Sequence, residues 1–194
     1  FYMDNLYFSN NTPTIGTPAP ATAPTTAASA PTADDTVAIS LYSDALTDDN
    51  VVTNFNPGWG QSGSLAAATD TDVAVGSVLK FTNLNYQGIQ LNNTDVSALS
   101  SVHLDLWSAA AGKVKFFIVS DNGAVSENGI ILDVTGGEWN SFDIDLAAFS
   151  GVDLTNVFQL KFDSQESVIG SADGLTDFYM DNLYFSNNTP TIGT

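Results

Sequence analysis

The stretch SVHLDLWSAAAGKVKFFIVSD, residues 101–121, contains two runs of alternating residue character, separated by a short Ala/Gly turn. In the first run, Val102, Leu104 and Leu106 take every second position, with polar or aromatic residues between them. A period of two residues is typical of a β-strand with one buried face. The second run, residues 113–121, alternates in the same way. Both runs therefore predict strands.

The same pattern recurs along most of the chain, between turns rich in Gly, Asn, Asp and Ser. Strands are predicted over residues 37–43, 78–84, 86–92, 101–109, 113–121, 128–134, 139–146, 157–164 and 178–186. Residues 146–151 suggest one helical turn, and no segment has the apolar spacing of a longer helix. Many short strands joined by turns predict an all-β fold, an antiparallel β-sandwich of the jelly-roll kind, whose strand order the pattern leaves open.

A long repeat decides the domain organisation. The first seventeen residues, FYMDNLYFSNNTPTIGT, are identical to residues 178–194, which indicates either a tandem array or an artificial duplication. From Ser9 to Ala33 the chain is rich in Thr, Ala and Pro, a composition typical of a linker. The predicted parts are the last strand of a preceding module copy (1–9), a Thr/Ala/Pro-rich linker (10–35), the sandwich module (36–186) and the start of the next linker (187–194).

The N-terminal copy predicts a strand docked on a module. Residues 1–9 have the sequence of the module's own last strand, so they can fill the same place in a sheet or pair with an exposed edge. The partner would be a neighbouring identical module in the parent chain, or a second chain in a strand-exchanged dimer.

Charge narrows the range of partners. The 194 residues include 22 acidic residues against four lysines and no arginine, a net charge of −18. Such a field repels nucleic acid and anionic membrane surfaces, and it argues against polyanionic glycans. Neutral ligands and divalent cations remain. The chain has no cysteine and no apolar run long enough to span a membrane.

The side of the strands opposite the apolar residues is polar but carries aromatic rings. It includes Tyr86, Gln90, Asp105, Trp107, Gln159 and Lys161. Polar groups around an exposed ring can hold a sugar, because the apolar face of a pyranose stacks on the ring while amides, carboxylates and ammonium groups bond its hydroxyls. The alternative is a solvated outer sheet in which a loop half covers Trp107.

The loop NFNPGWGQ, residues 54–61, supplies a further candidate. Pro57 and Gly58 predict a tight turn that presents Trp59 outward. Trp59 would then be a stacking platform and Gln61 a ligand for sugar hydroxyls. The alternative is that Trp59 plugs one end of the sandwich.

Acidic residues suggest a calcium site. Asp44 follows the first predicted strand and Asp181 lies in the last one, and the first and last strands of a sandwich often lie together. Calcium binds clusters of carboxylate, carbonyl and amide oxygens. The alternative is that these aspartates are solvated residues of turns.

Catalytic machinery is sparse in the sequence. His103 is the single histidine, and there is neither a cysteine nor a G-x-S-x-G motif. Carboxylates are numerous enough for a glycosidase-type pair, but a sandwich of this size has little room for the deep cleft that such a pair needs. We therefore expect no enzymatic activity.

Several strings together carry a family resemblance: ISLYSDALTD, NFNPGWGQ, LNYQGIQL, VHLDLWSA, GEWNSFDIDLAAF, VFQLKF and FYMDNLYF. Over residues 36–186 the chain resembles a module appended to secreted glycoside hydrolases of Bacteroidetes, such as laminarinase-like enzymes. More loosely, it is similar to calcium-containing jelly-roll carbohydrate-binding modules with a galactose-binding-like fold.

The resemblance implies a secreted or cell-surface, non-catalytic module that binds a glycan and holds a structural calcium ion. The SDA and DN strings imply Asp44 and Asp181 as metal ligands, and HLDLW and LNYQG place Asp105, Trp107 and Tyr86 on or beside the sugar face. The lack of a basic patch favours a neutral glycan, such as a β-glucan. The alternative function is a structural or adhesive spacer repeat that binds no sugar.

Overall fold

The computed structural model describes residues 21–34, 36–68 and 76–193. The elements of this part are β1 (Ile39–Tyr42), β2 (Val52–Asn54), β3 (Ser64–Ala68), β4 (Val78–Thr82), β5 (Tyr86–Thr94), β6 (Ser101–Trp107), β7 (Gly112–Asp121), β8 (Val125–Val134), β9 (Trp139–Asp145), the 3-10 helix η1 (Leu146–Ala148), β10 (Val157–Asp163), α1 (Glu166–Ile169) and β11 (Phe178–Ser186). None of these described helices is long and apolar enough to cross a lipid bilayer.

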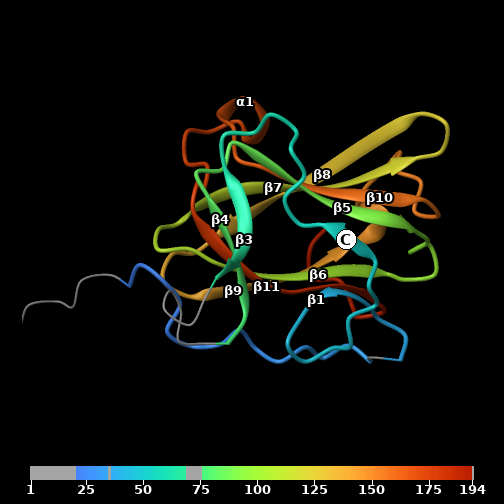
Figure 1. Cartoon of the computed structure of the whole chain (residues 1–194), viewed down its shortest axis with the longest axis horizontal. Helices are drawn as coiled ribbons and strands as arrows, with labels where there is room; N and C mark the ends of the chain where they lie inside the picture. The colour runs from blue at the N-terminus through green and yellow to red at the C-terminus, as the bar shows by residue number, and fades with distance from the viewer. Residues whose placement is uncertain (1–20, 35, 69–75, 194) are drawn as a thin grey trace, which may run out of the picture.

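The strands form two antiparallel sheets that lie as two layers (Figure 1). Sheet A has the order β3-β4-β11-β6-β9, with β1 also paired to β11, and sheet B has the order β2-β5-β10-β7-β8. The predicted all-β sandwich is therefore confirmed.

Phenylalanine rings from both layers fill the centre of the core. Phe81 and Phe178 from sheet A stack with ring centroids 4.3 Å apart, and Phe162 from sheet B lies 4.8 Å from Phe81. Phe116 of sheet B lies 5.1 Å from Phe162. All four are fully buried, and the alternation predicts the inward positions of Phe116 and Phe162.

Three described elements were not predicted, and one strand begins earlier than expected. The strands β2 and β3 are short and lack apolar alternation, and α1 has only four residues. The strand β8 begins at Val125 because the hairpin turn is at Asn122-Gly123, and not at Asn128-Gly129. Gly129 instead makes room for Phe117, whose ring a Cβ at that position would meet at 2.6 Å.

The last strand, β11, lies inside sheet A and contains a bulge. Its first half pairs with β4 and its second half with β1 on the same side, while β6 runs along the other side. Between the two halves, Asn182 takes a left-handed φ of 51°, and the register with β6 shifts between Asp181 and Tyr184. The expected neighbourhood of the first and last strands is thus confirmed.

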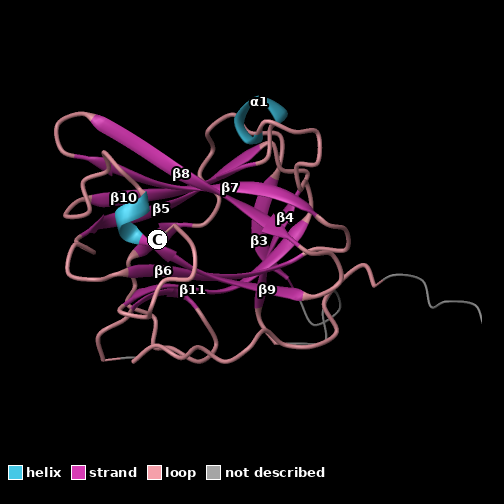
Figure 2. Ribbon diagram, turned by 180° about the vertical axis from the view of Figure 1, so that it is seen from behind, coloured by secondary structure: helices cyan, strands magenta, loops and turns pink. Residues whose placement is uncertain are grey.

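The described part of the predicted linker packs against the module. Residues 21–34, here named the connecting segment, run along the outer side of sheet A, at the bottom of both views (Figures 1 and 2). Past β11, residues 187–193 also turn back onto the sandwich, where Ile192 forms a bridge with Ile144 of β9. The strand predicted at residues 1–9 lies outside the described residues.

Candidate functional site

The loop between β2 and β3 places Trp59 on the outer side of sheet B. A Cβ built on Gly88 of β5 would lie 2.0 to 2.5 Å from three carbons of the Trp59 six-membered ring. The indole therefore lies directly against the backbone of Gly88, in space that any side chain would fill. The ring is half-buried and covers the outer side of β5, so it does not plug an end of the sandwich.

Hydrogen bonds hold this loop in place. The Trp59 amide donates to Gln61 Oε1 at 2.7 Å, while Gln61 Nε2 donates to Pro57 O at 2.8 Å and to Gln87 Oε1 at 3.0 Å. The Tyr86 hydroxyl donates to the carbonyl oxygen of Trp59 at 3.0 Å. Two of the predicted sugar ligands, Gln61 and Tyr86, thus hold the backbone of Trp59 through their polar groups.

A second ring, that of Phe117, lies on the same outer side of sheet B, two strands away from Gly88. Lys161 pairs with Gly88 on one side and with Phe117 on the other. Its Nζ lies 4.0 Å from the Phe117 ring centroid and 2.6 Å from Glu127 Oε1. Phe117 is only 7% exposed, because lysine side chains lie over it. Trp59 is therefore the more accessible of the two rings.

The side-chain amides of Gln90 and Gln159 lie next to Gly88 and Lys161 on the same outer side of the sheet. Gln159 and Gln90 face each other on neighbouring strands, and Gln159 Nε2 donates to Gln90 Oε1 at 2.8 Å. Gln90 Nε2 donates to the carbonyl of Phe158 at 3.1 Å. Each amide has more hydrogen-bonding positions than these contacts use. The pair can therefore also bond a hydroxyl that lies over the sheet.

Most of the lysines of the chain lie on this surface. Three of the four, Lys113, Lys115 and Lys161, lie on β7 and β10. Two of them are paired with acids, Lys161 with Glu127 and Lys113 with Asp173 at 3.4 Å. The outer side of sheet B therefore combines aromatic, amide and ammonium groups, and two of the ammonium groups are paired with carboxylates.

The eight predicted sugar-binding residues divide between the two sheets. Trp59, Gln61, Tyr86, Gln90, Gln159 and Lys161 belong to sheet B or to the loop upon it. Asp105 and Trp107 lie on β6 in sheet A, on the other layer. A single face that contains all eight, as the alternation suggests, does not exist in this fold.

The prediction that Trp107 and Asp105 are exposed is wrong. Trp107 is 3% exposed and packs against Val78 and Tyr179, with Ala23 of the connecting segment and Trp139 also in contact. Asp105 is 1% exposed; it accepts hydrogen bonds from the Ser141 hydroxyl at 2.5 Å and from Asn182 Nδ2 at 2.8 Å. Both side chains point away from the core, but the connecting segment and neighbouring polar groups cover that side.

His103 lies in the same covered layer. Its Nδ1 is 2.9 Å from Asp143 Oδ1, its Nε2 is 3.5 Å from Asp105 Oδ1, and its ring stacks on Tyr184 with centroids 4.6 Å apart. Burial alone would lower the pKa of His103, but hydrogen bonds to Asp105 and Asp143 outweigh it, so the pKa is raised.

The predicted metal ligands lie near the bulge of β11. Asp181 is buried, and burial raises its pKa to about 6, with a further contribution from the carboxylates of Asp44 and Asp105. Asp44 is exposed and accepts a hydrogen bond from the Ser77 amide at 3.1 Å. Within the described ranges, no group of three or more His, Cys, Asp or Glu side chains could hold a metal ion. The calcium site stays a prediction.

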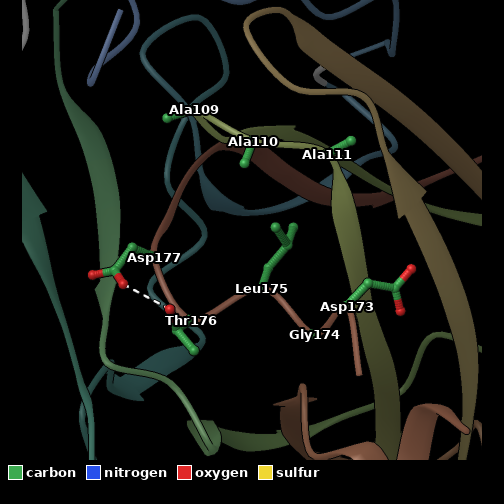
Figure 3. Close-up of a pocket in the computed structure, with 8 residues that line it drawn as sticks. All are labelled: Ala109, Ala110, Ala111, Asp173, Gly174, Leu175, Thr176 and Asp177. Atoms are coloured by element: carbon green, nitrogen blue, oxygen red, sulfur yellow. Dashed lines mark hydrogen bonds between the residues drawn. The ribbon is translucent and has the colours of Figure 1, made fainter. Parts of the chain in front are cut away.

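A hollow of about 310 Å³ lies where β6 ends and β7 and β11 begin (Figure 3). The turn Ala109–Ala111 and the loop from Asp173 to Asp177 line it, with the Leu175 side chain between them. The Thr176 hydroxyl is engaged with Asp177 Oδ2 at 2.8 Å. No aromatic ring lines the hollow, so it lacks a stacking surface for a sugar.

Two residues of the sheet B surface were missed from the sequence. Gly88 provides the space for Trp59, and Glu127 fixes Lys161. A glycine inside a strand pattern signals close approach of another group, so Gly88 was detectable in the string YQGIQL. Glu127 lies just before the strand predicted over residues 128–134, whereas β8 begins at Val125.

Comparison with solved structures gives similar folds. The chain matches the family 30 carbohydrate-binding module of a cellulosomal cellulase of Clostridium thermocellum with a TM-score of 0.54 and 16% identity, over 79% of this chain and 99% of that one. It matches the family 11 module of another cellulosomal cellulase of that organism with a TM-score of 0.52 and 18% identity, over 78% and 95%. The resemblance to carbohydrate-binding modules is thus confirmed at the level of the fold. No protein-family model and no curated protein matches the sequence.

Proposed function

We propose that the chain is a non-catalytic module that binds a neutral glycan, with a β-glucan favoured, on the outer side of sheet B. The observation that carries the proposal is the Trp59 ring, which lies on Gly88 and is fixed by Gln61 and Tyr86. A half-buried indole held against a sheet offers an apolar platform whose position costs little entropy on binding. The fold shared with carbohydrate-binding modules supports this function.

The polar groups beside Trp59 suit hydroxyls. Lys161 pairs with Gly88, on which the Trp59 ring lies, and the paired amides of Gln90 and Gln159 are two residues further along the same two strands. Because Lys161 is paired with Glu127, the surface has no free cluster of cations for a sulfated or carboxylated polymer among these residues. This arrangement favours an uncharged sugar.

Affinity electrophoresis against laminarin, mixed-linkage glucan, mannan, agarose and alginate tests the proposal. We expect retardation by a neutral β-glucan and none by alginate. Trp59→Ala should weaken binding by about 30-fold, the effect of losing a central aromatic anchor worth about 2 kcal/mol.

Trp139→Ala is the matched control, because Trp139 lies on β9 in sheet A. It should leave retardation unchanged. If Trp139→Ala abolishes binding and Trp59→Ala does not, the glycan binds the other sheet. Retardation by none of the polymers would contradict sugar binding itself.

The second candidate function is a spacer repeat that binds no sugar. The observation that favours it is the docked connecting segment. A module that binds the chain leading into it would hold the next domain of the same protein at a defined distance. A wild-type chain that no polymer retards, but that folds normally, would support this alternative.

We also propose that one calcium ion binds near Asp44 and Asp181. Burial raises the pKa of Asp181, and the carboxylates of Asp44 and Asp105 raise it further, so a cation beside Asp181 and Asp44 would relieve an unfavourable interaction. Because calcium takes six to eight oxygens, backbone carbonyls, amides or water would supply the rest.

Asp181→Asn tests the ion. Calcium should raise the melting temperature of the wild type and not that of the variant, and elemental analysis should find about one ion per wild-type chain. If a chelator changes nothing and Asp181→Asn is more stable than the wild type at pH 7, the carboxylate is unpaired and no ion binds.

The remaining features of the proposal are secretion and absence of catalysis. His103 and Asp105 are the two groups that most resemble a catalytic acid–base pair, and both are buried on β6 of sheet A. A secreted or cell-surface location agrees with a polysaccharide partner, as does the resemblance to modules of secreted enzymes. A strand-exchanged dimer through residues 1–9 remains a prediction, which sedimentation of the whole chain tests.

A further inference from the structure

The connecting segment meets sheet A at regular intervals. At its beginning, Ala23 packs on the cluster of Val78, Trp107 and Tyr179, and the next residue, Pro24, is buried. These contacts bury apolar surface of a segment whose composition predicts a free tether. The first anchor of the segment is therefore a hydrophobic contact with aromatic rings.

Three polar contacts follow along the segment. Trp139 Nε1 donates to the carbonyl of Thr26 at 2.7 Å, and Asn182 Nδ2 donates to the carbonyl of Ser29 at 2.9 Å. Further on, Asn188 Nδ2 donates to Thr32 Oγ1 at 3.2 Å. The donors come from β9, from the bulge of β11 and from the chain just after β11, so the segment crosses the sheet.

The kind of contact indicates the peptide that fits. The anchored positions are Ala23, Thr26, Ser29 and Thr32, and the chain bends at residues 22–23 and 25–26, around the first two of them. The segment supplies two carbonyls and one hydroxyl as acceptors, and the module supplies one indole and two amides as donors. A Thr/Ala/Pro-rich peptide suits this surface, because its side chains are small and its prolines have no amide hydrogen that needs an acceptor.

We propose that the outer side of sheet A is a binding groove for a Thr/Ala/Pro-rich connecting peptide, and that it fixes each module to the segment that leads into it. In this chain the occupant is the chain's own segment 21–34. The groove is independent of the glycan surface, which lies on sheet B.

The duplicated sequence extends the proposal to consecutive modules. Residues 187–193 dock on β9, where the Ile192 amide donates to Asp143 O at 3.1 Å and Ile192 O accepts from the Asp145 amide at 2.9 Å. Residues 10–16 have the same sequence. In a tandem array, the stretch that follows one module would then be docked on that module where it begins, and the module after it would hold the part equivalent to 21–34.

Backbone ¹⁵N relaxation of the whole chain tests the groove. In the wild type, order parameters across residues 21–34 should be about 0.8, as in the strands, whereas a free tether gives values below about 0.6. The Trp139 indole N–H should also resonate as a hydrogen-bonded group. Low order parameters over 21–34 in the wild type would overturn the proposal.

Two variants locate the anchors. Asn182→Gly keeps the left-handed backbone of the bulge and removes the amide, so order should fall around Ser29 and be retained near Ala23. Trp139→Phe keeps a ring and removes the donor, so order should fall around Thr26. An unchanged segment in both folded variants would show that the groove does not hold it.

Asn83→Gly is the matched control for the bulge variant. Asn83 also has a left-handed φ, 52°, and its side chain donates to Ser62 O, which lies away from the connecting segment. The order of residues 21–34 should not change in this variant. A loss of order there would mean that any change at a left-handed asparagine loosens the chain, which contradicts a specific groove.

Discussion

At the scale of single residues, Gly88 decides the position of the candidate sugar platform. Its missing side chain leaves the space that the Trp59 ring fills. Gly88→Ala would place a methyl group within 2.0 Å of that ring, while β5 remains free to form because alanine accepts an extended backbone. The variant should therefore displace Trp59 and weaken glycan retardation as strongly as Trp59→Ala.

Gly58→Ala is the control for this prediction, since a Cβ at Gly58 in the same loop meets nothing within 4 Å. It should bind as the wild type does. Equal affinity of the Gly88→Ala variant and the wild type would show that the ring position does not matter for binding.

A second prediction at this scale concerns His103. Its pKa is raised in the folded state by Asp105 and Asp143, with Tyr184 stacked on the ring. The charged form therefore stabilises the fold; this contribution is present below the unfolded pKa of about 6.5 and is lost as pH rises through the folded value. The stability difference between wild type and His103→Gln should be larger at pH 5.5 than at pH 9, as measured by urea unfolding. An equal difference at both pH values would contradict it.

At the scale of elements, β6 shows what alternation can and cannot predict. Its first residue and the inward positions of Val102, Leu104 and Leu106 agree with the prediction, although the strand ends at Trp107, two residues before the predicted end. Exposure of its opposite side was not, because alternation assigns a residue to a side of a strand and contains no information on what covers that side. The cover comes from a segment whose composition indicates a linker, about 80 residues earlier in the chain.

Trp107→Ala is the corresponding element-scale prediction. Removing a buried Trp from the contact with Val78 and Tyr179 should lower the free energy of unfolding by about 3–5 kcal/mol. Glycan retardation should not change at a temperature at which the variant is folded, because β6 belongs to the other sheet. Loss of binding with little loss of stability would instead make Trp107 a ligand.

Other elements were predictable to different degrees. The bounds of β11 agree with the prediction, since clear turn signals enclose its apolar residues, although the bulge at Asn182 interrupts their alternation. The candidate site was less predictable, because Trp59 lies in a loop and its position depends on hydrogen bonds to Gln61 and Tyr86. Contacts between residues distant in sequence leave no local pattern.

At the scale of the whole molecule, the docked segment predicts how consecutive modules are arranged. A longer chain, in which residues 18–194 follow Thr194 again, would contain two modules. A free tether would let the distance between them vary widely. Docking of the connecting segment on its module shortens the free part of the connection, so small-angle X-ray scattering should give one narrow distribution of distances. A broad distribution would contradict it.

The central place of β11 in sheet A also affects how the chain folds while it is being synthesised. This strand follows all the others described, yet it lies between β6 on one side and β1 and β4 on the other. While the chain is still on the ribosome, those strands have no neighbour in the middle of their sheet until these nine residues emerge. Open edges of this kind attract any strand of suitable sequence. In a longer polypeptide that strand could be the copy of FYMDNLYFS ahead of the module, which is translated first.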